Sequence, residues 1–195
     1  MNIIVIRYGG GNIQSVLFAL QRIGITPVIS SDLAIIKKAD KVIFPGVGEA
    51  SGTMKELKAS GLDNVIKELK QPFLGICLVL QLMCKYSEEG STDCLGIFNL
   101  KVKKFSPIDN NKVPHVGWNS IQQLKGPLFK TIPEDKYVYY VHSFYAELGK
   151  ETCATTNYIN PFSAALSKDN FYAVQFHPEK SGIVGETILK NFISL

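Results

Sequence analysis

The sequence predicts an α/β protein with an open, mostly parallel central sheet, flanked by helices and extended by antiparallel strands in its C-terminal half. Two patterns and one composition value support this fold class. Up to residue 86, short apolar runs alternate with helical periodicity, which is typical of strands joined by helical crossovers. From residue 97, strand-like segments follow one another across short polar connections. Hydrophobic residues make up 46% of the 195 residues, which is sufficient for the core of a single domain.

Four parallel strands are predicted in the first half, because a strand covered on both faces is a continuous apolar run. They span residues 3–6, 27–29, 41–44 and 73–76. The first strand is followed by three glycines at 9–11, and Asn12 is a suitable cap for the helix that comes next. The third strand is expected to stop at Pro45 and Gly46.

Helices are predicted where apolar residues recur at i, i+3, i+4 and i+7, as they do from Ile13 to Leu20 before Gly24. A second helical stretch at 49–70 is interrupted near Gly61, and residues 78–86 are apolar on nearly every side, which predicts a buried helix. The second half is predicted to form strands at 97–105, 137–141, 152–158, 162–166 and 171–176 and a last helix at 185–194.

The charge pattern does not favour nucleic-acid or membrane binding. The 21 basic and 17 acidic side chains leave a net charge of +4, and the densest basic run is only Lys101, Lys103 and Lys104. No apolar run reaches the roughly 18 residues of a membrane span. The first residues show neither the charged region nor the cleavage site of a signal peptide, so a cytoplasmic location is expected.

Cysteine and histidine spacing predicts neither a metal site nor a disulfide framework. The four cysteines include no C-x-x-C pair, and the three histidines include no H-x-x-x-H pattern. A dinucleotide site is not expected either, because Gln14 stands where G-x-G-x-x-G requires its third glycine. Neither a metal nor a dinucleotide cofactor is therefore predicted from these patterns.

Cys77 directly follows a predicted buried strand and precedes a predicted buried helix. A tight turn of this kind holds a side chain at the carboxyl edge of the sheet, where ligands of open α/β sheets bind. The N-terminus of the following helix favours a thiolate and offers N–H donors to an oxyanion. Cys77 is therefore either a nucleophile or a buried core cysteine, whereas core or surface positions are expected for Cys84, Cys94 and Cys153.

His177 and Glu179 stand two residues apart at the end of a predicted strand, with Pro178 between them. In extended backbone such residues share a face, and a carboxylate can fix the tautomer of a neighbouring imidazole. The alternative is a surface ion pair. His115 and His142 have no carboxylate close by in sequence, so hydrogen-bonded structural roles are expected for them, although His142 follows a strand beside a plausible pocket.

Two glycines, Gly46 and Gly48, flank Val47 directly after the third predicted strand. Glycine permits backbone conformations that are closed to other residues, so this loop could aim a backbone N–H at an oxyanion. The alternative is an ordinary connecting loop.

Together these motifs resemble the class I, or triad-type, glutamine amidotransferases. The resemblance rests on Pro45-Gly46-Val47-Gly48, on Gly75-Ile76-Cys77-Leu78 with Gln81, and on His177-Pro178-Glu179. Further segments are similar to the glutaminase subunits of imidazole glycerol phosphate synthases: Tyr8-Gly9, Gly11-Asn12, Ser15-Val16, Val116-Gly117-Trp118-Asn119, Tyr140-Val141-His142-Ser143 and Lys180-Ser181. The resemblance runs from about residue 3 to the end and implies one amidotransferase domain over residues 1–195.

The resemblance implies a reaction and a role for each motif. Cys77 would attack the carboxamide carbon of glutamine, His177 would transfer protons, and Glu179 would orient His177. The backbone N–H groups of Val47 and Leu78 would hold the oxyanion, the first of them after a peptide flip. Hydrolysis of the resulting glutamyl thioester would release glutamate.

The resemblance also implies a substrate site and a partner. Glutamine would be held by Gly46, Gly48, Gln81, Ser143 and the Phe144 backbone. The ammonia would pass to a synthase component, a TIM-barrel cyclase that makes imidazole glycerol phosphate and AICAR in histidine biosynthesis. Tyr139 and Lys180 would lie near the interface of this heterodimer, and neither a metal nor another cofactor is implied.

Two positions depart from the family pattern. Val79 replaces a glycine that usually follows the nucleophile by two residues, which puts the shape of the pocket in doubt. Arg7 replaces an acidic residue near the sheet edge, which puts the usual contacts there in doubt. Three alternatives therefore stay open: a paralogous glutaminase that serves another synthase, such as one amidating a nucleotide sugar; a catalytically inactive regulatory subunit; and a cysteine peptidase on a similar scaffold, which Gln81 disfavours.

Overall fold

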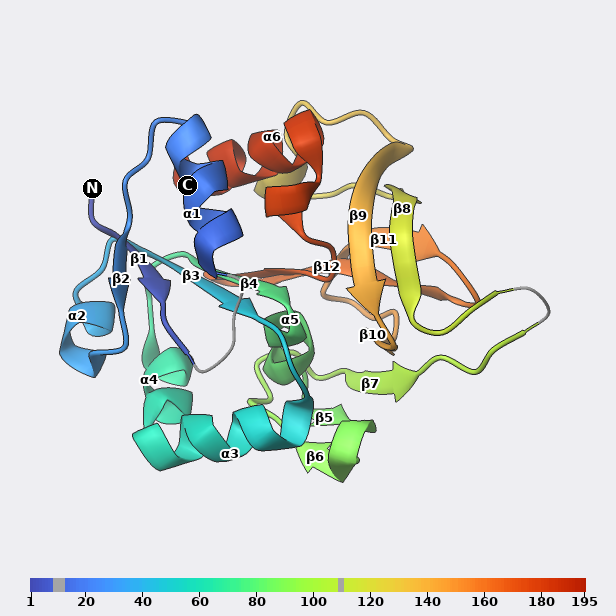
Figure 1. Cartoon of the computed structure of the whole chain (residues 1–195), viewed down its shortest axis with the longest axis horizontal. Coiled ribbons are helices and arrows are strands. Elements are labelled where there is room, and N and C mark those ends of the chain that lie inside the picture. Colours follow the sequence, from blue (N-terminus) through green and yellow to red (C-terminus); the bar gives the residue numbers. More distant parts are fainter. Residues whose placement is uncertain (9–12, 109–110) are drawn as a thin grey trace.

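A seven-stranded sheet in the order β11-β12-β13-β4-β3-β1-β2 forms the centre of the protein (Figure 1). This computed structural model describes residues 1–8, 13–108 and 111–195. The strands are β1 (Ile3–Ile6), β2 (Val28–Ser30), β3 (Lys41–Gly46), β4 (Phe73–Cys77), β11 (Thr152–Asn157), β12 (Pro161–Lys168) and β13 (Phe171–Val174). Neighbours from β13 to β2 are parallel, whereas β12 and β11 are added in antiparallel fashion, which confirms the predicted fold class.

Helices cover both faces of the central sheet (Figure 1). One face carries α1 (Ile13–Arg22) and α6 (Gly182–Ile193); the other carries α2 (Leu33–Lys37), α3 (Ala50–Ser60), α4 (Leu62–Glu68) and α5 (Leu78–Met83). Strand β1 serves both layers, because Ile3 and Val5 pack in the cluster with α1 and α6 while Ile4 and Ile6 pack in the cluster with α3 and α4. A strand with a buried side chain on each face must be apolar throughout, as β1 is.

Two smaller sheets accompany the central one (Figure 1). The first has the order β10-β7-β5-β6 and the second is the antiparallel hairpin β8-β9. Their strands are β5 (Tyr86–Ser87), β6 (Thr92–Asp93), β7 (Lys101–Lys104), β8 (His115–Ile121), β9 (Lys136–His142) and β10 (Phe144–Ala146); the 3₁₀ helices are η1 (Glu89–Ser91), η2 (Pro127–Phe129) and η3 (Pro178–Lys180). None of the helices in the described parts of the chain has the length and apolar character of a membrane span.

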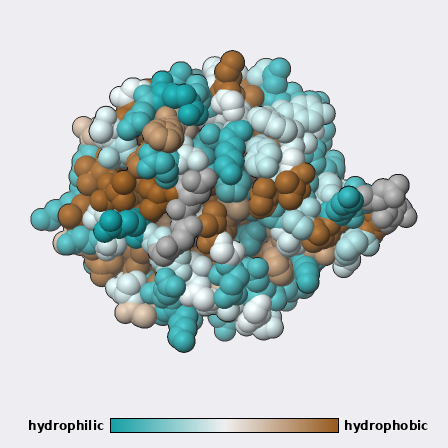
Figure 2. Space-filling view, in the orientation of Figure 1, coloured by the Kyte–Doolittle hydropathy of each residue, from teal (hydrophilic) through white to brown (hydrophobic). Residues whose placement is uncertain are grey.

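Apolar surface gathers at the outer edge of the central sheet, around β2 (Figure 2). Val28 and Ile29 of β2 and Ile35 of α2 are each more than 40% exposed there. The predicted strand at this place is present, but as an edge strand with one neighbour it is only half covered.

Several predicted elements differ from the structure in extent. The helix predicted at 78–86 ends at Met83, because Cys84 is extended and Tyr86 enters β5. The strand predicted at 97–105 is ordered as a strand only over Lys101–Lys104, and β3 continues through Pro45 and Gly46 instead of stopping before them. Strand β8 and helix α2 were not predicted. The glycines at 9–11 and the proposed cap Asn12 lie outside the described residues.

Candidate active site

A cavity of about 300 Å³ lies where the carboxyl ends of β3, β4 and β13 meet. Three neighbouring parallel strands deliver the three predicted motifs to this edge, since the loop after β3 brings Val47, the end of β4 brings Cys77 and the turn after β13 brings His177. The described residues that line the cavity are Val47, Gly48, Cys77, Leu78, Gln81, Glu89, Pro114, Val141, His142, Ser143, Phe144 and His177. This is the edge at which open α/β sheets bind ligands.

Cys77 is held on a strained turn between β4 and α5. Its backbone has φ +56° and ψ −109°, in the left-handed half of conformational space that residues with a side chain rarely occupy. Such a conformation costs on the order of 1–3 kcal/mol and persists only where the surroundings impose it. The thiol Sγ lies 3.8 Å from the carbonyl oxygen of Val141 and 3.8 Å from Nε2 of Gln175. The turn therefore presents the thiol to the cavity although the residue is only 7% exposed.

The other three cysteines lack this setting. Burial raises the pKa of Cys94 and of Cys153 to about 12, and raises the pKa of Cys84 well above its usual value. Thiols with raised pKa values supply little thiolate at neutral pH and are poor nucleophiles. The expectation that these three cysteines are structural fits their surroundings.

His177, which lines the cavity, forms a buried pair with Glu179. Nδ1 of His177 lies 2.8 Å from Oε1 of Glu179. Burial acts to lower the pKa of His177, but hydrogen bonds and charge interactions with Cys77 and Glu179 outweigh it and raise the pKa to about 10. Because Nδ1 is engaged by Glu179, Nε2 is the ring nitrogen left for Cys77. The chain thus has a thiol, an imidazole and a carboxylate in the order that nucleophilic catalysis needs.

The prediction of extended backbone between these two residues is wrong. β13 ends at Val174, and Glu179 lies in η3 instead of on a strand. A 3₁₀ turn after His177 brings the two side chains together, with Pro178 at its first position. The spacing predicted the contact correctly, but through a turn.

The two residues whose backbone N–H groups were predicted to hold an oxyanion, Val47 and Leu78, both line the cavity. Leu78 is the first residue of α5, so its N–H is among those that a helix leaves without an internal partner. Val47 lines the cavity and Gly48 beside it has φ +111°, which glycine adopts most readily. Gly46 does not line the cavity; it ends β3 opposite Cys77 in the register of β3 and β4.

Gln81, Ser143 and Phe144 all line the cavity. Nε2 of Gln81 donates to the carbonyl oxygen of Phe144 at 2.9 Å and to Oε1 of Gln175 at 3.0 Å. The Phe144 carbonyl also accepts from Nδ1 of His142 at 2.7 Å. Two donors fill both lone pairs of this oxygen, so a ligand cannot use the Phe144 carbonyl as an acceptor.

Glu89 is a site residue that the sequence did not reveal. It is the only carboxylate among the described residues that line the cavity, and one of its oxygens, Oε2, accepts from the N–H of Ala50 at 2.7 Å. Burial raises the pKa of Glu89, against the hydrogen bond from Ala50. A partly buried carboxylate in such a cavity suits an ammonium group. Nothing in the short 3₁₀ turn around Glu89 distinguishes it in sequence from the exposed glutamates of the chain.

The predicted interface residues lie together outside the cavity. Nζ of Lys180 lies 5.8 Å from the ring centre of Tyr139, and Trp118 meets the same ring edge-on at 5.9 Å. We call the exposed side of the β8-β9 hairpin the hairpin face; its apolar and aromatic members are Val116, Trp118, Tyr137 and Val141, each at least 41% exposed. Exposed apolar and aromatic side chains gathered on one face are typical of surfaces that contact another protein.

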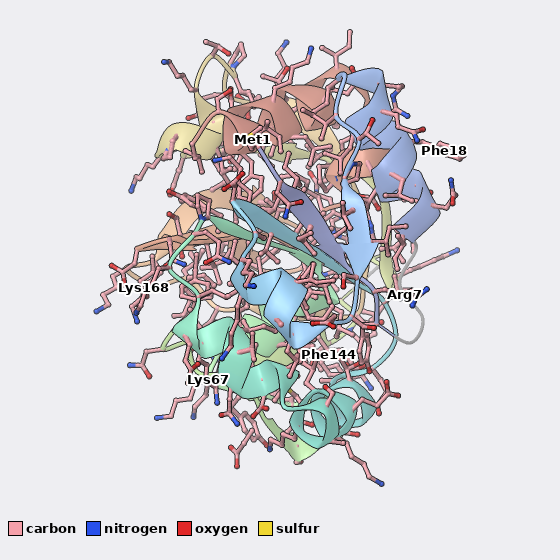
Figure 3. The ribbon with its side chains drawn as sticks, turned by 90° about the vertical axis from the view of Figure 1, so that its left-hand side faces the viewer. Met1, Arg7, Phe18, Lys67, Phe144 and Lys168 are labelled. Atoms are coloured by element: carbon pink, nitrogen blue, oxygen red, sulfur yellow. The ribbon has the colours of Figure 1, made fainter. Side chains whose placement is uncertain are left out.

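The two departures from the family pattern affect different places. Val79 is fully buried and does not line the cavity; its methyl groups pack against the bare backbone of Gly46 and Gly75. The extra bulk is therefore accommodated by two glycines in β3 and β4. Arg7 is exposed at the end of β1 (Figure 3), where its backbone N–H donates to the carbonyl oxygen of Ser30.

Comparison with known proteins gives a consistent result. The family described as glutamine amidotransferase class-I matches residues 5–195. The chain is 60% identical to the imidazole glycerol phosphate synthase subunit HisH of Bacteroides fragilis and 44% identical to that of Yersinia pseudotuberculosis, over 100% of both chains in each case. A crystal structure titled as a glutamine amidotransferase superposes with a TM-score of 0.76 at 15% identity, over 100% of this chain and 98% of that one. A structure of PurLQS from Thermotoga maritima gives a TM-score of 0.73 at 13% identity, over 99% of this chain and 97% of that one.

Proposed function

Because the chain belongs to the class I glutamine amidotransferases, we propose that it is the glutaminase subunit of an imidazole glycerol phosphate synthase in histidine biosynthesis. Its full-length identity to subunits of that synthase supports this assignment over a paralogous glutaminase. The contact between His177 and Glu179, beside the strained Cys77, carries the proposal because it supplies a complete set of catalytic groups against one cavity.

The proposed reaction begins with attack of the Cys77 sulfur on the carboxamide carbon of glutamine. His177 takes the thiol proton, and Glu179 keeps its ring oriented and stabilises the imidazolium. When the C–N bond breaks, His177 gives this proton to the departing nitrogen, so that ammonia leaves and a glutamyl thioester remains. Water, deprotonated by His177, then hydrolyses the thioester to glutamate and frees Cys77.

The tetrahedral intermediate needs two donors for its oxyanion. We assign these to the N–H groups of Leu78, at the start of α5, and of Val47, which lines the cavity after β3 and would turn its N–H to the oxyanion by a peptide flip. One such donor is worth about 3 kcal/mol of the barrier. The rate of glutamine hydrolysis can therefore be controlled through the conformation of the Val47 peptide.

Recognition of glutamine follows from the polar groups around the cavity. Glu89 suits the α-ammonium group of glutamine, because the two groups carry opposite charges and a charge-assisted hydrogen bond between them is strong. Gln81 has both N–H groups engaged by Phe144 and Gln175, so it meets a ligand only through its oxygen, again as an acceptor. Ser143 and Gly48 lie at the remaining walls and are assigned to the rest of the substrate.

The proposed partner is a cyclase subunit of TIM-barrel type that takes the ammonia before it escapes to water. The hairpin face and the Tyr139–Lys180 contact lie on strand and turn segments that also border the cavity, through Val141 and His177. A partner bound there would cover the route from the thiol to the exterior. We further propose a cytoplasmic location, since four free cysteines suit a reducing compartment.

Glutamate release in the presence of the co-purified synthase subunit tests this function. The wild-type complex is expected to convert glutamine to glutamate, and Cys77→Ser is expected to abolish the reaction while the complex still forms. Val79→Gly serves as the comparison that restores the family residue without touching the cavity wall. A wild-type complex that releases no glutamate would contradict the proposed function.

A further inference from the structure

Two buried histidines beside the cavity are not used by the proposed reaction. His115 in β8 and His142 in β9 are direct partners in the hairpin register. Nδ1 of His115 lies 3.0 Å from Nε2 of His142, and the residues are only 4% and 6% exposed. A buried contact between two imidazoles requires one donor and one acceptor, so the pair cannot be formed by two protonated rings.

The proton positions of this pair follow from a single backbone carbonyl. The Phe144 oxygen can only accept, so Nδ1 of His142, at 2.7 Å, must carry a proton. Burial lowers the pKa of His142 to about 3 and that of His115 to about 4, so both rings are neutral at pH 7. Nε2 of His142 is then an acceptor, which places a proton on Nδ1 of His115. Nε2 of His115 is in turn an acceptor, and Nδ2 of Asn119 lies 3.4 Å from it.

The same carbonyl fixes two amide side chains on the other side. Gln81 must present its nitrogen to the Phe144 oxygen, at 2.9 Å. The second N–H of Gln81 points to Gln175 at 3.0 Å, so the atom of Gln175 that receives it is the oxygen. The nitrogen of Gln175 is then directed at the Cys77 sulfur, 3.8 Å away. One network therefore runs from the hairpin to the thiol, with every donor and acceptor determined.

The hydrogen bonds of His115 can be separated from the packing of its ring. The ring is stacked between Tyr140, at 4.8 Å and 21°, and Tyr158, at 3.9 Å and 15°. Both stacks depend on a flat aromatic ring and not on its nitrogen atoms. Phenylalanine at this position keeps the ring and removes the N–H that reaches His142, together with the acceptor near Asn119.

We propose that His115 and His142 are positioning residues for glutamine hydrolysis. Through the Phe144 carbonyl they fix the orientation of the Gln81 amide, which faces the substrate glutamine. Gln81 in turn fixes the Gln175 amide, which donates to the Cys77 sulfur. This inference rests on the proposed function, and it assigns to the hairpin a direct structural connection with the reacting thiol. Neither histidine touches the substrate; both act through Phe144.

The decisive experiment compares His115→Phe, which keeps the stacked ring, with His115→Asn, whose amide retains a donor near the position of Nδ1. Glutaminase kinetics are measured in the complex with the synthase subunit. We expect His115→Phe to raise KM for glutamine about ten-fold, with a smaller fall in kcat, because a buried partner has lost its donor. His115→Asn is expected to recover most of this loss. Tyr158→Phe, which keeps the stacked ring and removes only the hydroxyl bond to the Lys112 carbonyl, is expected to match the wild type.

A second measurement does not depend on the proposed function. The rate at which iodoacetamide labels Cys77, followed by mass spectrometry without glutamine, should fall in His115→Phe and recover in His115→Asn. The ¹⁵N shifts of the wild-type protein should show the Nδ1–H tautomer for both histidines. A folded His115→Phe variant with wild-type KM and labelling rate would overturn the proposal, as would an Nε2–H tautomer at His142. Absence of glutamate release from the wild type would instead contradict the proposed function and leave labelling and tautomer to decide the role of the histidines.

Discussion

Nδ1 of His177 lies 2.8 Å from Oε1 of Glu179, and the second oxygen of Glu179 is buried without a hydrogen-bond partner among the described residues. Among the described residues, the Glu179 carboxylate therefore forms a hydrogen bond with the His177 imidazole and with no other group. An anion placed in this way raises the pKa of the ring and orients it towards the thiol. The buried position prevents water from taking the place of either partner.

Glu179→Gln should lower kcat for glutamine hydrolysis about 100-fold, with little change in KM, because proton transfer by a correctly poised imidazole contributes on that order. The pKa of His177 should fall in the variant, since the carboxylate that supports the imidazolium is gone. Steady-state kinetics of the complex across pH 6 to 10 measure both effects. Glu186→Gln is the matched control, because Glu186 pairs with Arg22 at the surface. Unchanged kcat in Glu179→Gln would refute the assigned role.

The hairpin face should be required for binding of the synthase subunit. Trp118 is 55% exposed and supported edge-on by Tyr139, which is the setting of an interface anchor. Trp118→Ala is expected to weaken the complex at least ten-fold, as measured by isothermal titration calorimetry, since anchors of this kind contribute on the order of 2 kcal/mol. Ile29→Ala removes a similarly exposed side chain at the far edge of the sheet and should leave the affinity unchanged. Equal affinities for the two variants would place the interface elsewhere.

The partner should also control the rate. The loop that holds Val47 is partly exposed beside the cavity and contains Gly48 at φ +111°, so its peptide can change orientation at low cost. If the partner sets the Val47 N–H towards the oxyanion, glutamate release should rise about 100-fold on complex formation, the value of one such donor. Glutamate release by the chain alone and by the complex is the measurement. Equal rates would contradict control by this loop.

The elements that could be predicted from sequence are those whose signal is local. Strands β1 and β4 are continuous apolar runs because both faces are covered, and Cys77 is marked by its position between two such segments. The contact of His177 with Glu179 spans two positions and needs no knowledge of the rest of the fold. Local spacing therefore sufficed to predict the turn at Cys77 and the contact of His177 with Glu179, whereas their proposed catalytic roles came from the resemblance to the family.

The remaining parts of the site depend on contacts between distant segments. Gln81 meets Phe144 across 63 positions and Gln175 across 94, and no pattern near any of these residues records the contact. Strand β8 mixes exposed and half-buried residues, so its apolar signal is weak, and its pairing with β9 defines it. For the same reason the orientation of Val79 towards Gly46, and away from the cavity, could not be foreseen.

The free energy of unfolding should fall as the pH is lowered from 7 to 5, because His115 and His142 are neutral in the folded chain. Their pKa values are lowered to about 3 for His142 and about 4 for His115, so the unfolded chain, with ordinary values near 6.5, binds protons in this range that the folded chain does not. The free energy of unfolding then falls as pH falls, by about 2 kcal/mol at pH 5 for His142 alone. His177 has the opposite effect on stability and acts in a different pH range. Because its pKa is raised to about 10, it stabilises the fold fully below about pH 6.5, and this stabilisation is lost as the pH rises towards 10. Urea unfolding at pH 5 and pH 7 should show the difference, and His115→Phe should reduce it; an unchanged difference in the variant would show that His115 does not contribute.

Val79 and Gly46 should be energetically coupled. A Cβ on Gly46 would lie 2.7 Å from a methyl group of Val79, so Gly46→Ala alone is expected to cost about 1–3 kcal/mol of unfolding free energy through overpacking. Val79→Ala removes that methyl group and should cost about 2 kcal/mol through the space it leaves. In the double variant the new Cβ enters this space, so the loss should be smaller than the sum by at least about 1 kcal/mol. Gly149→Ala is the matched control, because its Cβ would meet Leu100 instead, and its effect should simply add to that of Val79→Ala. Additive losses for Gly46→Ala and Val79→Ala would show that the valine does not fill the space above β3, and that the departure from the family glycine is accommodated in some other way.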